Sequence, residues 1–349
     1  MSEHRHNGRP DVADVVRRNP WESLLLVIFV GTVIFNVTQS TNYLDIDNFV
    51  NLFELSIEKV IIVVMMTFVI IAGEIDLSVA SVMGLSAAVL AVLNDGDAVP
   101  FWLAIVIAVA AGSAAGLVQG WCISRLGLPS LVVTLAGLIG LRGLARVFVE
   151  DRSFGGFPSW FEELGQESLI GPLPFSVVLF LVGIVIGGVV LARTALGRRV
   201  YVIGDNADVA RYSALNVGRF KIGLFVASGT VAAVAGVLYA ARLGSVRGDM
   251  ANGFELDIIT MVLLGGVSIF GGAGTMTGVA LAVLIVLNLR NGLGLANVEA
   301  NVQTGVVGVI LITSVLARNA IDSLRRRWDR SAPPARDLDV PSPTVGSAW

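Results

Sequence analysis

The sequence has little charge, almost no lysine or histidine, and one cysteine. Charged residues make up 15% of its 349 residues, whereas an ordinary soluble domain carries about 25%. Hydrophobic residues make up 55%, and the mean hydropathy is +0.79. One core cannot hide this much apolar surface, so the excess must face lipid. The composition therefore disfavours a cytoplasmic enzyme and a secreted domain, and the net charge of −3 gives no basic field that would bind a nucleic acid.

The scarcity of cysteine and histidine excludes several kinds of site. Cys122 is alone and forms no intrachain disulfide, and its apolar surroundings favour a small buried hydrophobe over a nucleophile. His4 and His6 both lie in the polar first twenty residues, so the apolar body has no histidine for a metal site or a Ser-His relay. We therefore expect no catalytic residue, no metal and no enzyme, although a membrane-embedded carboxylate mechanism stays open as a third hypothesis.

The two lysines of the sequence decide whether the chain itself could be a P-loop ATPase. Only Lys59 and Lys221 are present among 24 basic residues, and each precedes a hydrophobic residue. A P-loop needs Gly-Lys-Ser/Thr, because its lysine must reach the β- and γ-phosphates. The chain is therefore not a P-loop ATPase. We expect it to bind no cofactor itself, and any ATP and Mg²⁺ would be used by a partner subunit.

Apolar runs predict an all-α integral membrane protein with about ten transmembrane helices. A span needs about 20 residues, and short, glycine-interrupted runs are typical of helices that break inside a transporter. The second, eighth and ninth runs are short in this way. The ten runs are Trp21–Val37, Val60–Gly73, Leu77–Leu93, Phe101–Cys122, Ser130–Phe148, Phe175–Ala192, Ile222–Ala241, Ile258–Phe270, Met276–Leu289 and Val302–Ala317.

The basic residues set the predicted orientation. With ten alternating spans and a cytoplasmic N-terminus, seventeen basic residues fall inside and five outside, and two more lie within the fifth span. Both termini are then cytoplasmic, in a bacterial inner membrane. The chain divides into a tail over 1–20, a transmembrane domain over 21–318 that contains an inner loop over 193–221, and a C-terminal tail over 319–349 whose composition predicts disorder.

Charges and glycines inside the apolar body are candidate pathway residues. Glu74 and Asp76 form either a solvated turn, in which Asp76 or Ser78 caps the next helix, or a broken helix beside a pathway. Arg142 could pair with either carboxylate, as could Arg146, or reach the membrane surface. The run from Leu264 to Thr275 contains Gly265, Gly266, Phe270, Gly271 and Gly272 and predicts a break or close packing. It does not predict nucleotide binding, because it lies between apolar spans.

The inner loop over 193–221 is the predicted docking surface for an ATPase subunit. Within it, Asn206 or Asp205 could cap a short helix. The alternative is an ordinary amphipathic helix at the lipid surface. The residues predicted to couple this loop to the ATPase are Gly204, Asn206, Ala207, Ala210, Arg211, Ser213 and Ala214.

Several ordered motifs resemble one family, the ribose-type ABC importer permeases. The stretch Gly73-Glu-Ile-Asp-Leu-Ser-Val-Ala-Ser81 resembles the family's Gly-Gly-Ile-Asp-Leu-Ser-Val-Gly-Ser, with Glu74 and Ala80 in place of two glycines. The resemblance runs from about Glu58 to Ala317. The other matching stretches are Leu128–Gly137, Arg142-Gly143, Ile203–Ala214, Glu255-Leu-Asp257, Leu264-Gly-Gly266, Phe270-Gly-Gly272 and Arg290-Asn291-Gly-Leu293.

The resemblance implies a permease subunit that moves a ribose- or rhamnose-like monosaccharide by alternating access. It implies two inverted repeats, over spans two to five and seven to ten. The expected partners are a cytoplasmic ABC ATPase, an extracytoplasmic sugar-binding protein, a second permease copy or paralogue, and the lipid bilayer. An ion-coupled secondary transporter is the alternative, because Glu74 and Asp76 would suit it equally well.

Overall fold

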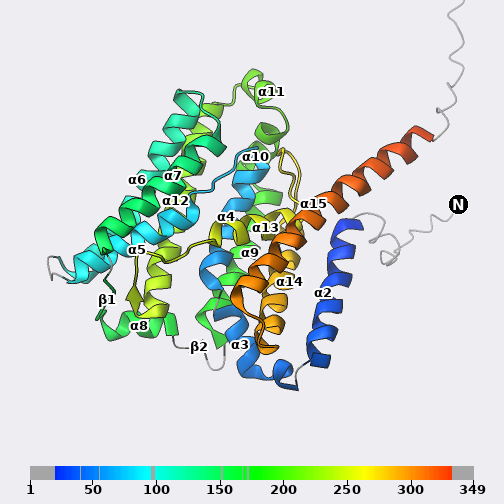
Figure 1. Cartoon of the computed structure of the whole chain (residues 1–349). Helices are drawn as coiled ribbons and strands as arrows, with labels where there is room; N and C mark the ends of the chain where they lie inside the picture. The colour runs from blue at the N-terminus through cyan, green and yellow to red at the C-terminus, as the bar shows by residue number, and fades with distance from the viewer. Residues whose placement is uncertain are drawn as a thin grey trace, which may run out of the picture.

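The computed structural model describes residues 20–331, except 40, 55, 96–98, 151, 167 and 171–172. Almost all of this part is helical (Figure 1), which confirms the predicted all-α membrane fold. The described strands form two small antiparallel pairs. β1 (Phe154–Gly155) pairs with β4 (Ser245–Val246), and β2 (Ser168–Ile170) pairs with β3 (Leu173–Pro174).

Each of the ten predicted spans coincides with one helix. These helices are α2 (Pro20–Gln39), α4 (Ile57–Ile71), α5 (Val79–Asp95), α6 (Phe101–Arg125), α7 (Ser130–Val149), α9 (Phe175–Arg193), α12 (Val217–Leu243), α13 (Phe254–Leu264), α14 (Met276–Leu295) and α15 (Ala300–Ser331). Shorter elements connect them: the 3-10 helix η1 (Thr41–Leu44), α3 (Ile46–Glu54), α8 (Ser159–Gln166), α10 (Ala195–Asp205) and α11 (Ala207–Tyr212).

Length separates the helices into two groups. In the described part of the chain, five helices are long and apolar enough to cross a membrane alone, namely α2, α6, α7, α12 and α14. The pair α9 and α10, bent by 71° at its break, makes a possible sixth. Of the other predicted spans, α5 and the apolar part of α15 over Ala300–Ser314 are shorter apolar helices, and α4 and α13 have 15 and 11 residues. The ninth span, predicted to be short, is a helix of 20 residues.

Two boundaries in the structure differ from the predicted ones. The eighth span ends at Leu264 rather than at Phe270, because Gly265 and Gly266 turn the chain out of α13. The predicted C-terminal tail begins inside α15, which continues to Ser331. The rest of that tail and residues 1–19 lie outside the described residues.

The short helices α4 and α13 form the centre of the molecule (Figure 1), with α5, α6, α7 and α12 on one side and α2, α14 and α15 on the other. Side chains on all faces of α4 and α13 are buried, among them Ile62, Met66, Ile258 and Met261. A helix that is apolar all round and short can be stable only inside other helices. α4 spans 15 residues, which at 1.5 Å per residue is about 22 Å.

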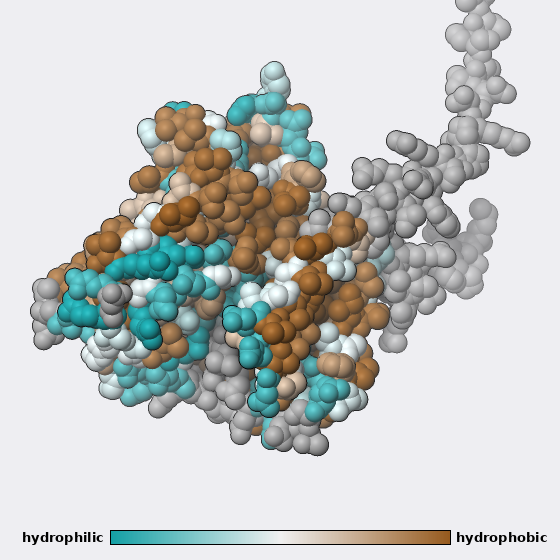
Figure 2. All heavy atoms as spheres, viewed as in Figure 1, coloured by the Kyte–Doolittle hydropathy of each residue, from teal (hydrophilic) through white to brown (hydrophobic). Residues whose placement is uncertain are grey.

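The long helices carry the surface that faces lipid. Large apolar side chains are exposed on α2, α6 and α7, including Val27, Val118 and Ile139. Figure 2 shows this hydrophobic surface over α6, α7 and α15, with hydrophilic side chains gathered near α11 and, at the opposite end, near α8. An apolar belt between two polar ends is the surface that a bilayer requires.

Candidate functional site

The predicted coupling helix is present in the inner loop as α11. The Asn206 side chain caps it, because its Oδ1 accepts hydrogen bonds from the backbone N–H groups of Asp208 at 2.9 Å and Val209 at 3.1 Å. The helix contains Ala207, Ala210 and Arg211 and ends at Tyr212. Its C-cap is Ser213, and Ala214 follows in the left-handed region with a φ of 60°.

The surface of α11 is suited to contact with another protein. Ala210 is buried, whereas the Tyr212 side chain is 93% exposed. Arg211 is exposed and pairs with Asp208 at 2.8 Å. α11 lies at the end of the molecule that Figure 1 places farthest from α3 and α8.

Backbone contacts join the base of this loop to the end of α4 and to the connection between α13 and α14. The Gly272 N–H donates to the carbonyl oxygen of Ile71 at 2.8 Å. A Cβ added to Gly271 would lie 2.8 Å from both the Gly204 oxygen and the Gly73 Cα, closer than real Cβ atoms approach. Gly73, Gly271 and Gly272 also have positive φ, which favours glycine. We call Ile71, Gly73, Gly204, Gly271 and Gly272 the glycine junction.

The other predicted residues of the glycine-rich run are not part of the junction and have other surroundings. Gly265 packs against Val279 on α14, where an added Cβ would be 2.6 Å from the Val279 Cα. Gly266 has a φ of 85° and turns the chain out of α13. Phe270 is 86% exposed beside the junction. The run therefore both breaks and packs closely, as predicted.

Glu74 and Asp76 are buried, so the prediction of a solvated turn is wrong. Glu74 is 6% exposed and Asp76 is 2% exposed. Glu74 forms an ion pair with Lys221, near the start of α12. The predicted pairing of Arg142 with these carboxylates is also wrong, because α7 directs Arg142 toward Glu255 on α13.

Asp76 holds the turn that leads into α5. Its Oδ1 accepts from the backbone N–H of Ser78 at 2.9 Å and from the Ser78 hydroxyl at 2.6 Å, immediately before α5 begins. Its Oδ2 accepts from the Ser228 hydroxyl on α12 at 2.7 Å. Ser78 also contacts Gln119 of α6 at 3.0 Å. The turn between α4 and α5 is thus held against two long helices.

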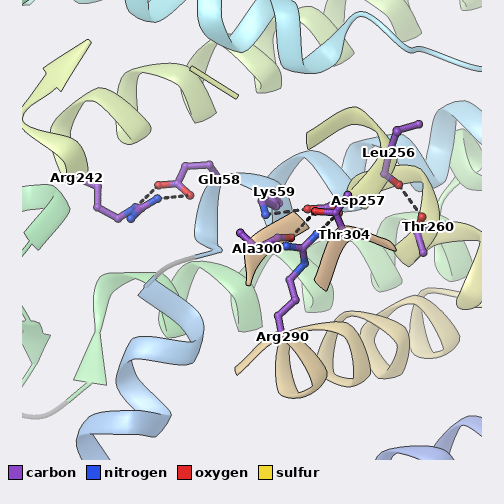
Figure 3. A network of polar contacts seen from close by, with 9 residues as sticks. All are labelled: Glu58, Lys59, Arg242, Leu256, Asp257, Thr260, Arg290, Ala300 and Thr304. Atoms are coloured by element: carbon purple, nitrogen blue, oxygen red, sulfur yellow. Dashed lines mark hydrogen bonds and ion pairs between the residues drawn. The ribbon is translucent and has the colours of Figure 1, made fainter. Parts of the chain in front are cut away.

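A second polar group lies at the opposite ends of α4 and α13 (Figure 3). We call it the ion-pair network. It consists of three pairs drawn in Figure 3, Arg242–Glu58 at 2.6 Å, Lys59–Asp257 at 2.9 Å and Arg290–Asp257 at 2.5 Å, and of Arg142–Glu255 at 3.1 Å. Glu58 is fully buried, and the Lys59 and Asp257 side chains are 8% and 7% exposed. Buried charges must be paired in this way, because an unpaired one is strongly destabilising.

Sequence reasoning missed most of this network. Arg142 was a predicted site residue, but Glu58, Lys59, Arg242 and Asp257 were not. The available signals were the Glu255-Leu-Asp257 motif and the rarity of lysine.

A cavity of about 610 Å³ adjoins the network and contains a predicted pathway residue, Asn291. The Asn291 amide nitrogen donates to the Asn48 side chain at 2.8 Å, and Asn48 donates back at 3.1 Å. The predicted candidates therefore separate into two places. Gly204, Gly271, Gly272 and Glu74 lie near the glycine junction, whereas Arg142 and Asn291 lie near the network about 22 Å away along α4.

No group of three or more histidine, cysteine or carboxylate side chains that could hold a metal occurs among the described residues.

Comparison with known proteins gives one consistent result. Residues 48–315 match the family described as "Branched-chain amino acid transport system / permease component". The chain is 34% identical over 335 residues to the autoinducer 2 import system permease protein LsrD of Yersinia pseudotuberculosis, covering 91% of this chain and 99% of the relative. It is 36% identical over 318 residues to LsrD of Yersinia enterocolitica, covering 88% and 94%. No solved structure matches. The predicted resemblance to importer permeases, and the prediction of a transport subunit rather than an enzyme, are confirmed.

Proposed function

Because the chain belongs to this family of transport-system permease components, we propose that it is the membrane subunit of an ATP-driven importer that moves a ribose- or rhamnose-like monosaccharide inward by alternating access. The matched relatives are named for import of autoinducer 2, which supports a small polar substrate. The proposal assigns ATP and Mg²⁺ to a separate ABC ATPase, because neither lysine lies in a P-loop.

The proposed orientation places the glycine junction at the cytoplasmic side. The inner loop over 193–221 contains six of the chain's basic residues, and basic loops stay in the cytoplasm. The ion-pair network then lies at the extracytoplasmic side, where a sugar-binding protein would deliver the substrate. Both termini are cytoplasmic in this arrangement.

The observation that carries the proposal is the direct contact of the coupling loop with the end of α4 and with the connection that follows α13. Gly204 packs backbone to backbone against Ile71, the last residue of α4, and against Gly272, between α13 and α14. A push on α11 by the ATPase would therefore displace the end of α4 and, through this connection, α13, because close-packed elements transmit strain. The same helices carry Lys59 and Asp257 at their far ends, so a motion at the cytoplasmic side reaches the extracytoplasmic side.

A second permease copy or paralogue completes the proposed assembly. α7 exposes large apolar side chains such as Leu131 and Ile139. It also has two exposed glycines, Gly140 and Gly143, with open space beside them. Small residues permit close helix approach in membranes, which supports α7 as one contact. The ion-coupled alternative is not adopted, because Glu74 already has a cationic partner in Lys221 and the named relatives are import-system permeases.

The experiment is transport by the chain reconstituted in liposomes with its ATPase and binding protein. We expect Gly204→Leu to abolish ATP-driven uptake of labelled ribose, rhamnose or autoinducer 2, while Gly223→Leu leaves it intact. The Gly204 site has no room for a side chain, whereas Gly223 on α12 has open space around its Cβ position. Uptake that continues without any ATPase, or that stops on collapse of an ion gradient while ATP remains, would contradict the proposal.

A further inference from the structure

The cavity beside the ion-pair network is lined by four elements at the Asp257 end. α3, α4, α14 and α15 supply its lining, which consists of Asn48, Leu52, Ser56, Lys59, Leu287, Arg290, Asn291, Gly294, Leu295 and Gln303. Its volume of about 610 Å³ falls in the range of sites for small molecules, about 300–1,000 Å³. The lining combines two cationic side chains, Lys59 and Arg290, with other polar and apolar ones.

The charges around this cavity do not balance. Lys59 and Arg290 both bind the single carboxylate of Asp257 (Figure 3). The other two ion pairs of the network are one to one, Arg242 with Glu58 and Arg142 with Glu255. Among the described side chains, the network therefore has one more cation than carboxylate, and the surplus lies at the cavity wall. An uncompensated buried charge is costly, and an anion placed beside it would offset that cost.

Hydrogen-bond donors are also in surplus. A guanidinium has five N–H groups and an ammonium has three, yet among described residues each of these two side chains makes one hydrogen bond, to Asp257. The Arg290 Nε is buried without a partner in that part of the chain. Lys59 also stands over the Phe254 ring, with its Nζ 4.2 Å from the centroid. Two acceptor oxygens of the lining are already occupied, since the amides of Asn48 and Asn291 bond each other.

From this excess of positive charge and donors, we propose that the cavity is an anion-binding site for one oxyanion group of the phosphate type. Lys59 and Arg290 would bind the oxyanion by charge-assisted hydrogen bonds. The group could belong to a free small molecule or to the head group of an anionic phospholipid, because both carry phosphate-type oxygens that accept charge-assisted hydrogen bonds. The site is independent of the proposed transport function.

The test uses the full-length chain in nanodiscs. In one arm, the nanodisc lipid is phosphatidylcholine and inorganic phosphate is titrated by calorimetry. In the other, the lipid is a mixture of phosphatidylcholine and phosphatidylglycerol, and native mass spectrometry measures which lipid the chain retains. Saturable phosphate binding identifies a free anion as ligand, and selective retention of phosphatidylglycerol identifies a head group. The proposal is wrong if neither occurs.

Two variants locate the site, each with a matched control. Arg290→Gln removes the surplus charge and leaves Lys59 paired with Asp257. Gly294→Leu fills the cavity from α14 without touching an ion pair, and space is open at its Cβ position. We expect each to lower anion affinity or lipid selectivity at least tenfold. The controls are Arg247→Gln, in an exposed ion pair, and Gly31→Leu, an open position on α2; both should bind as the parent does.

The Gly294→Leu result is decisive even if Arg290→Gln fails to fold. Unchanged binding in Gly294→Leu would show that the anion binds elsewhere and would overturn the assignment. A purely structural role of Arg290 predicts that Gly294→Leu has no effect, because that substitution leaves the network intact.

Discussion

The two ends of α4 are held by different kinds of contact. At the glycine junction, backbones touch directly, and Gly271 and Gly204 leave no room for a side chain. At the ion-pair network, long charged side chains meet, as in Lys59 with Asp257. Backbone contact is rigid and short in range, whereas ion pairs can break and form again. Under the proposed function, the junction end receives a displacement and the network end opens in response.

The largest expected effect is on stability at the network. Asp257→Ala leaves two buried cations without their carboxylate, and breaking a buried pair typically costs about 3–5 kcal/mol. Asp249→Ala is the control, because Asp249 and Arg247 form an exposed pair at 3.6 Å, and such pairs contribute under about 1 kcal/mol. The midpoint of thermal unfolding in nanodiscs measures both. Equal shifts for the two variants would show that the network is not a buried structural element.

The next effect separates backbone strain from steric contact at the glycine junction. Gly271 and Gly253 both have a φ of 83°, but only Gly271 has atoms within 4 Å of its Cβ position. Alanine in the left-handed region costs about 1–2 kcal/mol at either place. We expect Gly271→Ala to lower ATP-driven transport at least tenfold and Gly253→Ala to lower it less than threefold. Similar losses would mean that strain, not contact with Gly204, limits the Gly271 variant.

A smaller effect is expected at the turn between α4 and α5. Ser228→Ala removes a hydrogen bond of 2.7 Å to the buried Asp76 carboxyl group, and bonds to charged groups contribute about 1.5–3 kcal/mol. Ser113→Ala, whose hydroxyl on α6 lies 2.7 Å from that of Thr230 on α12, removes a bond between neutral groups worth about 1 kcal/mol. Chemical denaturation of the reconstituted chain compares them. A smaller loss for Ser228→Ala than for Ser113→Ala would contradict the structural role assigned to Asp76.

The smallest effect is expected on the exposed surface of α11. Asp208→Asn removes an ion pair with Arg211 in which both side chains are more than half exposed, so stability should change by less than about 0.5 kcal/mol. ATPase binding is the more sensitive measurement, because the freed Arg211 lies on the proposed docking helix. An unfolding midpoint lowered by several degrees would show that α11 depends on this pair.

The sequence predicted the positions of the helices better than the contacts between them. Apolar runs identified all ten long or central helices, and Asn206 identified the start of α11, because both signals are local. The pairing of Lys59 with Asp257 joins residues 198 positions apart. Which buried charges meet is decided by how the helices pack, and no local pattern contains that information. For the same reason Arg142 was placed beside the wrong carboxylate.

The division of the spans into outer and central helices was likewise only partly predictable. Short apolar runs and glycines correctly indicated short or broken helices at α4 and α13. The ninth run was also predicted to be short, but it forms a helix that continues through Asn291 to Leu295. Polar residues such as Asn288 and Arg290 interrupt the apolar pattern there, yet they are accommodated by contacts with Tyr43 and Asp257. Contacts with residues on other elements therefore stabilise α14 beyond the point at which hydropathy alone predicted its end.

The central claim is that α4 and α13 carry motion from the coupling loop to the ion-pair network. It is tested most directly by electron paramagnetic resonance distances between spin labels at residues 249 and 296, both exposed at the network end, with Cys122 replaced by alanine. The reconstituted importer, diluted with unlabelled chain, is measured with and without a nonhydrolysable ATP analogue. We predict that the nucleotide shifts the distance between the two spin labels in the parent. In the Gly204→Leu variant, assembled with the ATPase, the nucleotide should leave this distance unchanged. A shift of equal size in Gly204→Leu would contradict the account.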